Sequence, residues 1–227
     1  MARAPDRHGQ PSSNSAGSFS QDAESLMEAL GPLSSPLALK KGEILFNEGD
    51  EADTLFCVEQ GMLEVSLLSP EGRRLTLDIA RDGALLGEIA MFDPGPRTAT
   101  ITALESSSLR VVRHGDVLHA MDEDAALARS LFRIAGQRMR WMNAQMMEQA
   151  TLVAPVRIAR RLLYLTQSSS DELHLSQEEL ADFSGTTREA VSRAFKGWKK
   201  AGLIEVSRRG IRVLDRAMME TLADAAD

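Results

Sequence analysis

Several residues between Gly87 and Ala99 have the types and spacing needed to hold an anion. Gly87 allows the backbone to approach a ligand closely, and one helical turn over residues 88–92 would point free N–H groups at a negative charge. A Pro-Gly-Pro run ends that turn, and Arg97 follows with a planar guanidinium that suits phosphate oxygens. The spacing predicts a phosphate-binding loop; the alternative is an ordinary surface loop that carries a solvated ion pair.

Short apolar segments flank this loop and would hold it in place. Strands are expected over 42–46, 55–59, 62–68, 74–80, 99–104 and 108–112, most of them separated by Gly-containing turns. Closely spaced strands of this kind are typical of a barrel or sandwich, and here they predict a β jelly roll. The loop would then be a helical interruption between two barrel strands, which favours the phosphate-binding interpretation.

A long helix is expected over residues 127–152, after the last of these strands. Mostly apolar positions alternate three and four apart along it, at Phe132, Ala135, Met139, Met142, Met146, Gln149 and Val153. This heptad spacing predicts a seam between the parallel helices of a homodimer. An apolar stripe that faces the chain's own core is the alternative.

The last third of the chain has the pattern of a winged helix–turn–helix. A helix is expected from Pro155 to Leu165. Ser176 and Glu179 form a capping box that starts a second helix, which ends near Phe183. A third helix follows a Ser-Gly turn, and the apolar runs within 203–213 predict a β-hairpin wing.

The third helix of this region carries the residues that would read DNA. The side chains of Arg188, Glu189 and Arg193 share the sector near its start, the end that would enter a major groove. Arg can bind guanine O6 and N7, and Glu can accept a hydrogen bond from cytosine N4. The remaining DNA-facing candidates are Thr186, Thr187, Ser192, Lys196, Lys199 and Lys200, with either threonine as the N-cap. Solvated surface charges are the alternative.

The charge distribution agrees with a DNA-binding C-terminal region. Residues 155–216 contain 12 Lys and Arg and 8 Asp and Glu, which gives this region a net charge of +4. The whole chain has a net charge of −7, so the remaining residues have a net charge of −11. An acidic chain is not a general nucleic-acid binder, but a locally basic domain is the expected electrostatic footprint of a DNA-reading module.

Composition excludes several other classes of protein. The one cysteine, Cys57, rules out a disulfide framework and a cysteine-ligated iron–sulfur cluster within one chain. The four histidines lack metal-ligand spacing, so no metal site is expected. No apolar run reaches the roughly 20 residues of a membrane span, and the N-terminus lacks the apolar core of a signal peptide, so we expect a cytoplasmic protein. No catalytic motif with a supporting context is present, so we do not expect an enzyme.

Two motifs carry a resemblance to a known family. The stretch Gly87–Ala99 resembles the phosphate-binding cassette of cyclic-nucleotide-binding domains, and Thr187-Arg188-Glu189-Ala190-Val191-Ser192-Arg193 resembles the DNA-reading motif of the cyclic-AMP receptor protein/FNR (CRP/FNR) transcription regulators. The order of barrel, long helix and winged helix matches that family over about residues 25–215. The resemblance implies an α+β chain with an N-terminal β jelly-roll cyclic-nucleotide-binding domain, a dimerisation helix and a C-terminal winged helix–turn–helix.

The domain boundaries follow from these elements. Residues 1–20 are expected to be a disordered tail because they contain little apolar sequence. Residues 21–125 would form the cyclic-nucleotide-binding domain, with a short helix over 21–33. Residues 126–153 would form the dimerisation helix, and residues 154–227 the DNA-binding domain.

The resemblance also assigns roles within the ligand site. It implies that Glu88 binds the ribose 2′-hydroxyl and that Arg97 binds the cyclic phosphate. The rest of the cassette would be Gly87, Ile89, Ala90, Thr98 and Ala99, and Val65 and Leu77 would contact the base and ribose.

The identity of the nucleotide depends on three further residues. A hydroxyl at Thr98 can bond guanine N2 when the base is syn. Met142 and Asn143 occupy the positions of the long helix that meet the base in relatives, where both residues carry hydroxyls. Asn143 has donors and acceptors that could read guanine. These residues favour cGMP slightly, and cAMP remains the alternative.

The sequence therefore predicts a homodimeric transcription factor gated by cGMP or cAMP. Its expected partners are a palindromic DNA site with half-sites similar to TGTGA and RNA polymerase, with no membrane and no catalytic cofactor. A regulator that binds DNA without a ligand, and whose barrel serves dimerisation or protein docking, is the alternative.

Overall fold

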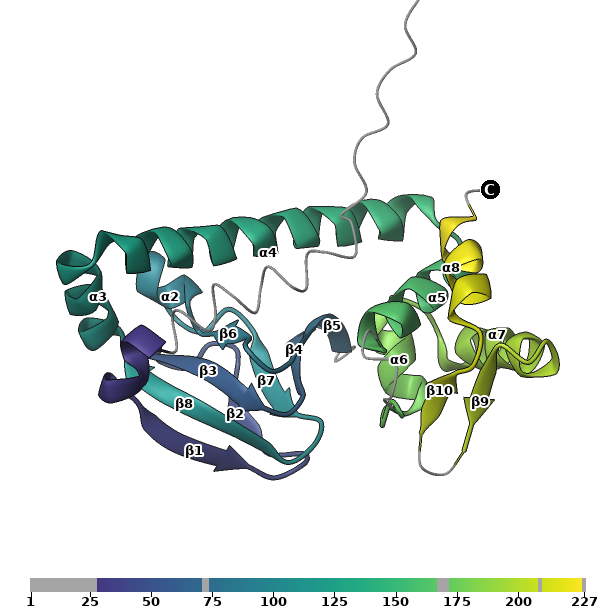
Figure 1. The fold of residues 1–227 in the computed structure, drawn as a ribbon, viewed down its shortest axis with the longest axis horizontal. Helices are drawn as coiled ribbons and strands as arrows, with labels where there is room; N and C mark the ends of the chain where they lie inside the picture. Colours follow the sequence, from purple (N-terminus) through teal and green to yellow (C-terminus); the bar gives the residue numbers. More distant parts are fainter. Residues whose placement is uncertain (1–27, 71–73, 167–171, 208–209, 226–227) are drawn as a thin grey trace, which may run out of the picture.

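The computed structural model describes residues 28–70, 74–166, 172–207 and 210–225. The expected tail over 1–20 and most of the expected helix over 21–33 lie outside these ranges. The described chain is α+β, with an N-terminal β-sandwich, a long helix α4 and a C-terminal helical domain with a small β-hairpin (Figure 1).

Two four-stranded antiparallel sheets form the N-terminal domain. One sheet has the order β1-β8-β3-β6 and consists of β1 (Ser35–Leu39), β8 (Ser107–Arg113), β3 (Thr54–Gln60) and β6 (Leu85–Leu86). The other has the order β2-β7-β4-β5 and consists of β2 (Ile44–Phe46), β7 (Thr100–Ala103), β4 (Leu63–Leu68) and β5 (Arg74–Ala80). Apolar side chains from both sheets, including Phe56, Val65 and Leu109, fill the space between them.

Six of these eight strands match the sequence predictions, and β1 and β6 were missed. Strand β1 contains Pro36, which reads as a strand breaker, but β1 lies at the edge of its sheet, where a missing N–H is tolerated. Strand β6 has two residues, too few for a pattern of alternation. The helical turn after it is α2 (Ile89–Phe92), which interrupts the strands as expected.

Helix α3 (His114–Glu123) was not predicted, and it precedes α4 (Ala125–Thr151). The Asp124 side chain caps α4 by accepting a hydrogen bond from the Ala126 N–H at 2.8 Å. The first turns of α4 bury Leu127, Leu131 and Ile134 against the sandwich. The 27-residue helix is about 40 Å long, and it runs from the sandwich to the C-terminal domain (Figure 1).

The C-terminal domain is a winged helix–turn–helix, as predicted. It contains α5 (Ala154–Leu165), α6 (Gln177–Phe183), α7 (Arg188–Lys200), β9 (Ile204–Val206), β10 (Ile211–Val213) and α8 (Arg216–Asp224), of which α8 was not expected. The capping box of Ser176 and Glu179 starts α6. Thr187, and not Thr186, caps α7. Gly185 makes the turn between them with φ +57°, a conformation that favours glycine.

The two domains share buried contacts. Ile79 of β5 and Leu104 belong to the same apolar cluster as the helices of the C-terminal domain. The Arg81 guanidinium donates a hydrogen bond to the carbonyl oxygen of Leu165 at the end of α5. Strand β5 is therefore packed against the C-terminal domain. Among the helices of the described ranges, none is both long and apolar enough to cross a membrane.

Candidate functional site

A cavity of about 290 Å³ lies between the sandwich and α4. Ten of the predicted ligand-binding residues line it: Val65, Leu77, Gly87, Glu88, Ile89, Ala90, Arg97, Thr98, Ala99 and Met142. Asn143 is exposed on α4 and does not line the cavity. The cavity thus brings together residues that are as far apart in the chain as β4 and the middle of α4.

Gly87 is needed at the junction of β6 and α2 for two reasons. Its φ is +82°, which side-chain-bearing residues rarely adopt. A Cβ atom there would collide with the Arg97 guanidinium and lie 2.9 Å from the carbonyl oxygen of Thr54. The glycine therefore gives the arginine the space that it occupies beside the loop.

Arg97 is buried, with 4% of its surface exposed. Its Nη1 donates to the Thr54 carbonyl at 2.8 Å, and its Nη2 donates to the Thr54 hydroxyl at 2.9 Å. The guanidinium lies 4.3 Å from the ring centre of Phe46, and burial lowers its pKa from the usual value. Its buried Nε has no hydrogen-bond partner among the described residues, and Nη2 carries a second N–H, so donors remain for an anion.

Glu88 is equally buried and is held by an arginine of α4. Nη1 of Arg138 lies 2.6 Å from Oε1 of Glu88, and it also donates to the Leu85 carbonyl at 3.2 Å. Burial opposes the charge on Arg138, but the neighbouring Glu88 and Asp78 carboxylates raise its pKa above the usual value. This pair connects the cassette to the long helix.

Arg138 and Trp141 are cavity residues that the sequence interpretation missed. The heptad assignment followed the adjacent face of α4, one residue further along the helix at each position. A second stripe was visible in the sequence, because Leu127, Leu131, Ile134, Arg138 and Trp141 are spaced alternately four and three apart. An arginine that interrupts an apolar stripe was the signal that could have identified it.

Trp141 also contacts the DNA-binding domain. Its ring stacks on Phe183, with centroids 6.4 Å apart and an interplanar angle of 11°, and lies 5.9 Å from Tyr164 of α5. The Arg161 guanidinium lies 5.2 Å from the Phe183 ring centre, and its Nε donates to the Phe183 carbonyl at 3.2 Å. Phe183 is the last residue of α6, so a wall of the cavity packs directly on the helix–turn–helix.

Most of the predicted seam residues are exposed along α4. Phe132, Met139, Met142, Met146 and Val153 are exposed, with Met146 exposed by 70%, and Ala135 is half-buried. Phe132 stacks on Phe92 of α2 with ring centres 5.7 Å apart. The amide of Gln149 lies against Gly185 of the same chain, and the residue is exposed, so its assignment to the seam stays a prediction. The other positions form an exposed apolar row.

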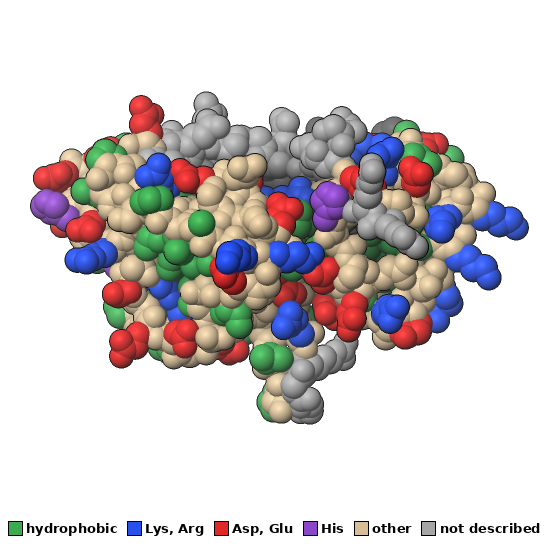
Figure 2. Space-filling model, turned by 90° about the horizontal axis from the view of Figure 1, so that it is seen from below, with side chains coloured by type: hydrophobic (Ala, Val, Ile, Leu, Met, Phe, Trp, Pro, Cys, Tyr) green, Lys and Arg blue, Asp and Glu red, His purple; other side chains and the backbone are tan. Residues whose placement is uncertain are grey.

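The residues predicted to contact DNA lie together on α7 and its N-terminus. Arg188, Glu189, Ser192, Arg193 and Lys196 are exposed, whereas Val191 and Phe195 face the core. Thr187 is exposed and caps the helix through a 3.3 Å hydrogen bond from the Ala190 N–H; Thr186 is half-buried. Figure 2 shows Lys and Arg side chains projecting from the end of the molecule that this domain forms.

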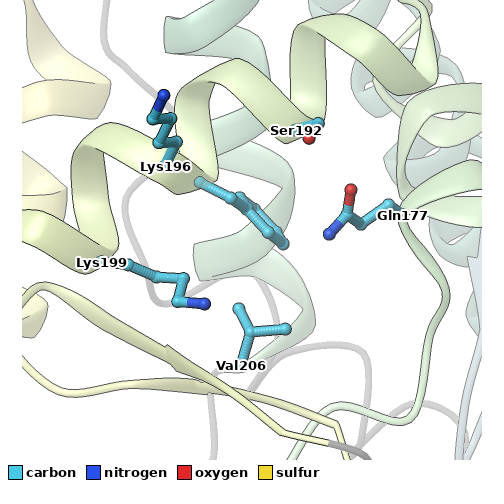
Figure 3. A pocket seen from close by; sticks show the side chains of 6 residues that line it. Gln177, Ser192, Lys196, Lys199 and Val206 are labelled. Carbon is cyan, nitrogen blue, oxygen red and sulfur yellow. The ribbon is translucent and has the colours of Figure 1, made fainter.

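A hollow of about 320 Å³ lies beside this surface. Its lining comes from α7, β9 and the start of α6, namely Gln177, Ser192, Phe195, Lys196, Lys199 and Val206. In Figure 3 the Gln177 amide reaches toward α7, and Lys199 lies between the helix and the wing. These donors border the path that a DNA backbone would take along α7.

Two other kinds of site, a reactive cysteine and a metal site, have no support among the described residues. Cys57 is buried in β3, and burial raises the pKa of its thiol to about 12. Within the described ranges, no group of three or more His, Cys, Asp or Glu residues is arranged to hold a metal ion.

Comparison with known families gives two matches that divide the chain at α4. The cyclic nucleotide-binding domain matches residues 36–124, and the Crp-like helix-turn-helix domain matches residues 156–222. The two matched regions contain the cavity cassette and the α7 surface, respectively.

Curated proteins resemble the chain over most of its length. The transcriptional regulator LdrP of Thermus thermophilus is 33% identical over 193 residues, which cover 81% of this chain and 94% of that protein. The CRP-like cAMP-activated global transcriptional regulator of Mycobacterium tuberculosis is 28% identical over 217 residues, which cover 88% of this chain and 93% of that protein.

Solved structures share the fold. FixK2 from Bradyrhizobium japonicum has a TM-score of 0.76 at 24% identity and covers 86% of this chain and 99% of its own. A transcriptional regulator of the CRP family from Thermus thermophilus has a TM-score of 0.73 at 28% identity and covers 84% of this chain and 97% of its own.

Proposed function

Since the chain belongs to the CRP/FNR family of DNA-binding transcription regulators, we propose that a purine cyclic nucleotide binds in the cavity and sets its affinity for DNA. The chain has a cyclic nucleotide-binding domain and a Crp-like helix–turn–helix, and it is a regulator, not an enzyme. The nucleotide, the homodimer and the DNA site are the parts of this function that we propose.

The observation that carries the proposal is that Glu88 and Arg97 both line one cavity. Both side chains are 4% exposed, and most of the surrounding wall is apolar. A buried guanidinium with a spare donor suits a cyclic phosphate, and a buried carboxylate suits a ribose hydroxyl. A ligand that carries both groups at a fixed separation would satisfy both residues.

We propose cGMP as the preferred nucleotide, with cAMP as the competitor to be tested. Thr98 lines the cavity next to Arg97, where its hydroxyl would meet the N2 amino group of a syn guanine. Relatives named as a cAMP-activated regulator and a cyclic AMP receptor protein make cAMP the natural comparison. Asn143 lies outside its own chain's cavity, so it would reach the base only from a second subunit.

The exposed apolar row on α4 supports a homodimer. Phe132, Met139, Met142 and Met146 are exposed and keep the spacing of a coiled-coil seam. Burying such side chains against a second copy would remove them from water. Two α7 helices related by this seam would lie about 34 Å apart on successive turns of one DNA face.

Trp141 is the proposed route from the ligand to the DNA-binding domain. It lines the cavity and stacks on Phe183, the residue before the turn that leads to α7. A ligand that moves the Trp141 ring would change the packing of α6, provided that the two states bind the ligand with different affinities.

On DNA, Arg188, Glu189 and Arg193 would read the bases of half-sites similar to TGTGA, and the threonines and lysines of α7 would contact phosphates. RNA polymerase is the expected protein partner of the DNA-bound dimer.

Calorimetric titration of the full chain with cGMP and with cAMP tests the proposal. Saturable binding of one or both nucleotides is expected. If neither binds at millimolar concentration while a specific DNA duplex binds tightly, the chain is a ligand-independent regulator whose sandwich serves another purpose.

A further inference from the structure

Asp78 of β5 lies in the wall of the cavity because the sheet is irregular at this point. Val65 of β4 pairs with Asp78, but the next residue, Ser66, pairs with Thr76, so Leu77 is an extra residue in β5. Such a bulge changes the direction of side chains in a strand. Leu77 and Asp78 therefore both line the cavity.

The flanking residues of β5 confirm this geometry. Thr76 donates a 2.6 Å hydrogen bond to Glu64 on the opposite face of the sheet, and Ile79 packs into the core of the C-terminal domain. A regular strand would place alternate residues on one face. The bulge thus directs a carboxyl group to the ligand side of β5.

The Asp78 carboxylate has an incomplete set of partners within the described part of the chain. Its Oδ1 accepts a 2.8 Å hydrogen bond from the Ile79 N–H, and it forms no ion pair there, since Arg138 is engaged with Glu88. Burial raises the pKa of Asp78, and the positive charge of Arg138 opposes that shift. A carboxylate in a mainly apolar wall is costly to the fold, and such groups concentrate at functional sites.

The position of Asp78 places it at the base end of a bound nucleotide. Arg97 and Glu88 occupy the cassette end, where the phosphate and ribose would bind. Asp78 pairs with Val65 across the sheet and follows Leu77, and both of these apolar residues line the cavity. This apolar wall suits the face of a purine, so the Asp78 carboxyl would meet the edge of the base.

A carboxylate distinguishes the two purines by their hydrogen-bond donors. Guanine presents N1–H and N2–H side by side, and the two oxygens of a carboxylate can accept both. Adenine presents N6–H beside N1, which is an acceptor, so a carboxylate would gain one bond and face one repulsive lone pair.

We propose that Asp78 is the base-reading residue of the cavity and that it selects guanine, which makes cGMP the effector. The inference rests on the proposed function, because it requires a purine cyclic nucleotide in this cavity.

The test compares the wild-type chain with Asp78→Asn by calorimetry with cGMP, cAMP and inosine 3′,5′-cyclic monophosphate, which lacks the N2 amino group. The wild type should bind cGMP most tightly. An asparagine can accept from N6–H and donate to N1 of adenine, so the variant should lose about 5- to 150-fold in cGMP affinity and should prefer cAMP. The advantage of cGMP over the inosine nucleotide should disappear in the variant.

Asp116→Asn is the matched control, because Asp116 is exposed on α3 and outside the cavity. It should leave all three affinities unchanged. A wild type that prefers cAMP, or an Asp78→Asn variant that keeps the wild-type ratio of cGMP to cAMP affinity, would overturn the assignment of Asp78 alone. A folded wild type that binds none of the three nucleotides would overturn the proposed function as well.

Discussion

The cavity and the α7 surface use the same kinds of charged side chain in opposite environments. Glu88 and Arg97 are buried, and each is already bonded to another part of the chain, to Arg138 and Thr54. Arg188 and Arg193 are exposed on α7 and surrounded by solvent. Charges that become buried need partners in the folded state, whereas exposed charges are stabilised by water without partners.

This difference indicates where the two states of the protein would differ. A nucleotide in the proposed site would use the free Nε of Arg97 but would compete with Arg138 for Glu88, so its binding would change the packing between the cassette and α4. The α7 surface needs no internal rearrangement to bind DNA. Under the proposed mechanism its affinity would depend on where the helix is held, which is the property that packing through Trp141 and Phe183 would change.

Arg97→Ala should have the largest effect, and it should be confined to the cavity. Charge-assisted hydrogen bonds contribute about 1.5–3 kcal/mol each, so loss of two would weaken cGMP and cAMP binding by about 100-fold or more. Calorimetry measures this loss. Arg110→Ala, which removes an exposed arginine of β8 paired with Glu59, is the control and should bind as the wild type does. Unchanged affinity in a folded Arg97→Ala chain would refute the cassette assignment.

Arg188→Ala and Arg193→Ala should affect DNA binding by α7 and leave the cavity unchanged. Each should cost about 1–3 kcal/mol of specific DNA binding and relax the preference at its guanine, with nucleotide affinity unchanged. Fluorescence anisotropy with matched and base-substituted duplexes measures both effects. Lys199→Ala should instead weaken binding to all sequences evenly and reduce the salt dependence. Equal losses on specific and random DNA for the arginine variants would exclude base reading.

Trp141→Ala should weaken the coupling between nucleotide binding in the cavity and DNA binding by α7. The variant loses the stacking contact with Phe183, so the factor by which nucleotide raises DNA affinity should fall about tenfold. Trp141→Phe keeps an aromatic ring and should retain most of the coupling. Trp198→Phe, at the only other tryptophan of the chain, is the control for loss of an indole. If Trp141→Ala keeps the full nucleotide effect, the signal follows another route.

Thr98→Ala removes a hydroxyl from the cavity wall. One neutral hydrogen bond is worth about 0.5–1.5 kcal/mol, so cGMP affinity should fall by about two- to tenfold while cAMP affinity stays constant. Competition binding with the two nucleotides measures the ratio. Parallel losses would assign Thr98 to the phosphate and not to the base.

Substitution of Asp78 should give the smallest effect, which is a change in the stability of the ligand-free chain. Burial raises the pKa of Asp78 above the usual 3.8 despite Arg138 and Arg161, while Glu88 adds to the increase. The ionised form therefore destabilises the fold at neutral pH. The folded state gains stability as the pH falls from the raised pKa to 3.8, and below 3.8 the carboxyl is protonated in both states.

The Asp78→Asn chain should accordingly melt at a higher temperature than the wild type at pH 7. Each kcal/mol corresponds to about 2–4 °C for a chain of this size. The difference should shrink as the pH falls toward 3.8, which thermal unfolding at a series of pH values would measure. A difference that stays constant with pH would show that Asp78 does not carry the buried charge.

Local sequence was enough to predict the parts that depend on neighbouring residues. The cassette from Gly87 to Ala99, the capping box at Ser176 and the exposed face of α7 each lie within one short stretch, and the structure contains all three. Thr187 and Thr186 are both good caps, and only the backbone decides between them.

The parts of the structure that depend on contacts between distant residues could not be predicted from local sequence. The bulge at Leu77 depends on the pairing of β5 with β4, so no local pattern indicated that Asp78 lines the cavity. Arg138 and Trp141 belong to the face of α4 that lines the cavity, and the seam spacing on the adjacent face concealed them. Gln149 fits a heptad position but contacts Gly185 of its own chain, since the helix–turn–helix packs back on α4.

The central claim is that a nucleotide in the cavity sets the affinity of α7 for DNA. Fluorescence anisotropy of a labelled palindromic duplex with TGTGA half-sites, titrated with the wild-type chain with and without saturating cGMP or cAMP, tests it most directly. We predict that the preferred nucleotide raises DNA affinity by about 5- to 150-fold. Equal DNA affinity with and without both nucleotides would contradict the claim.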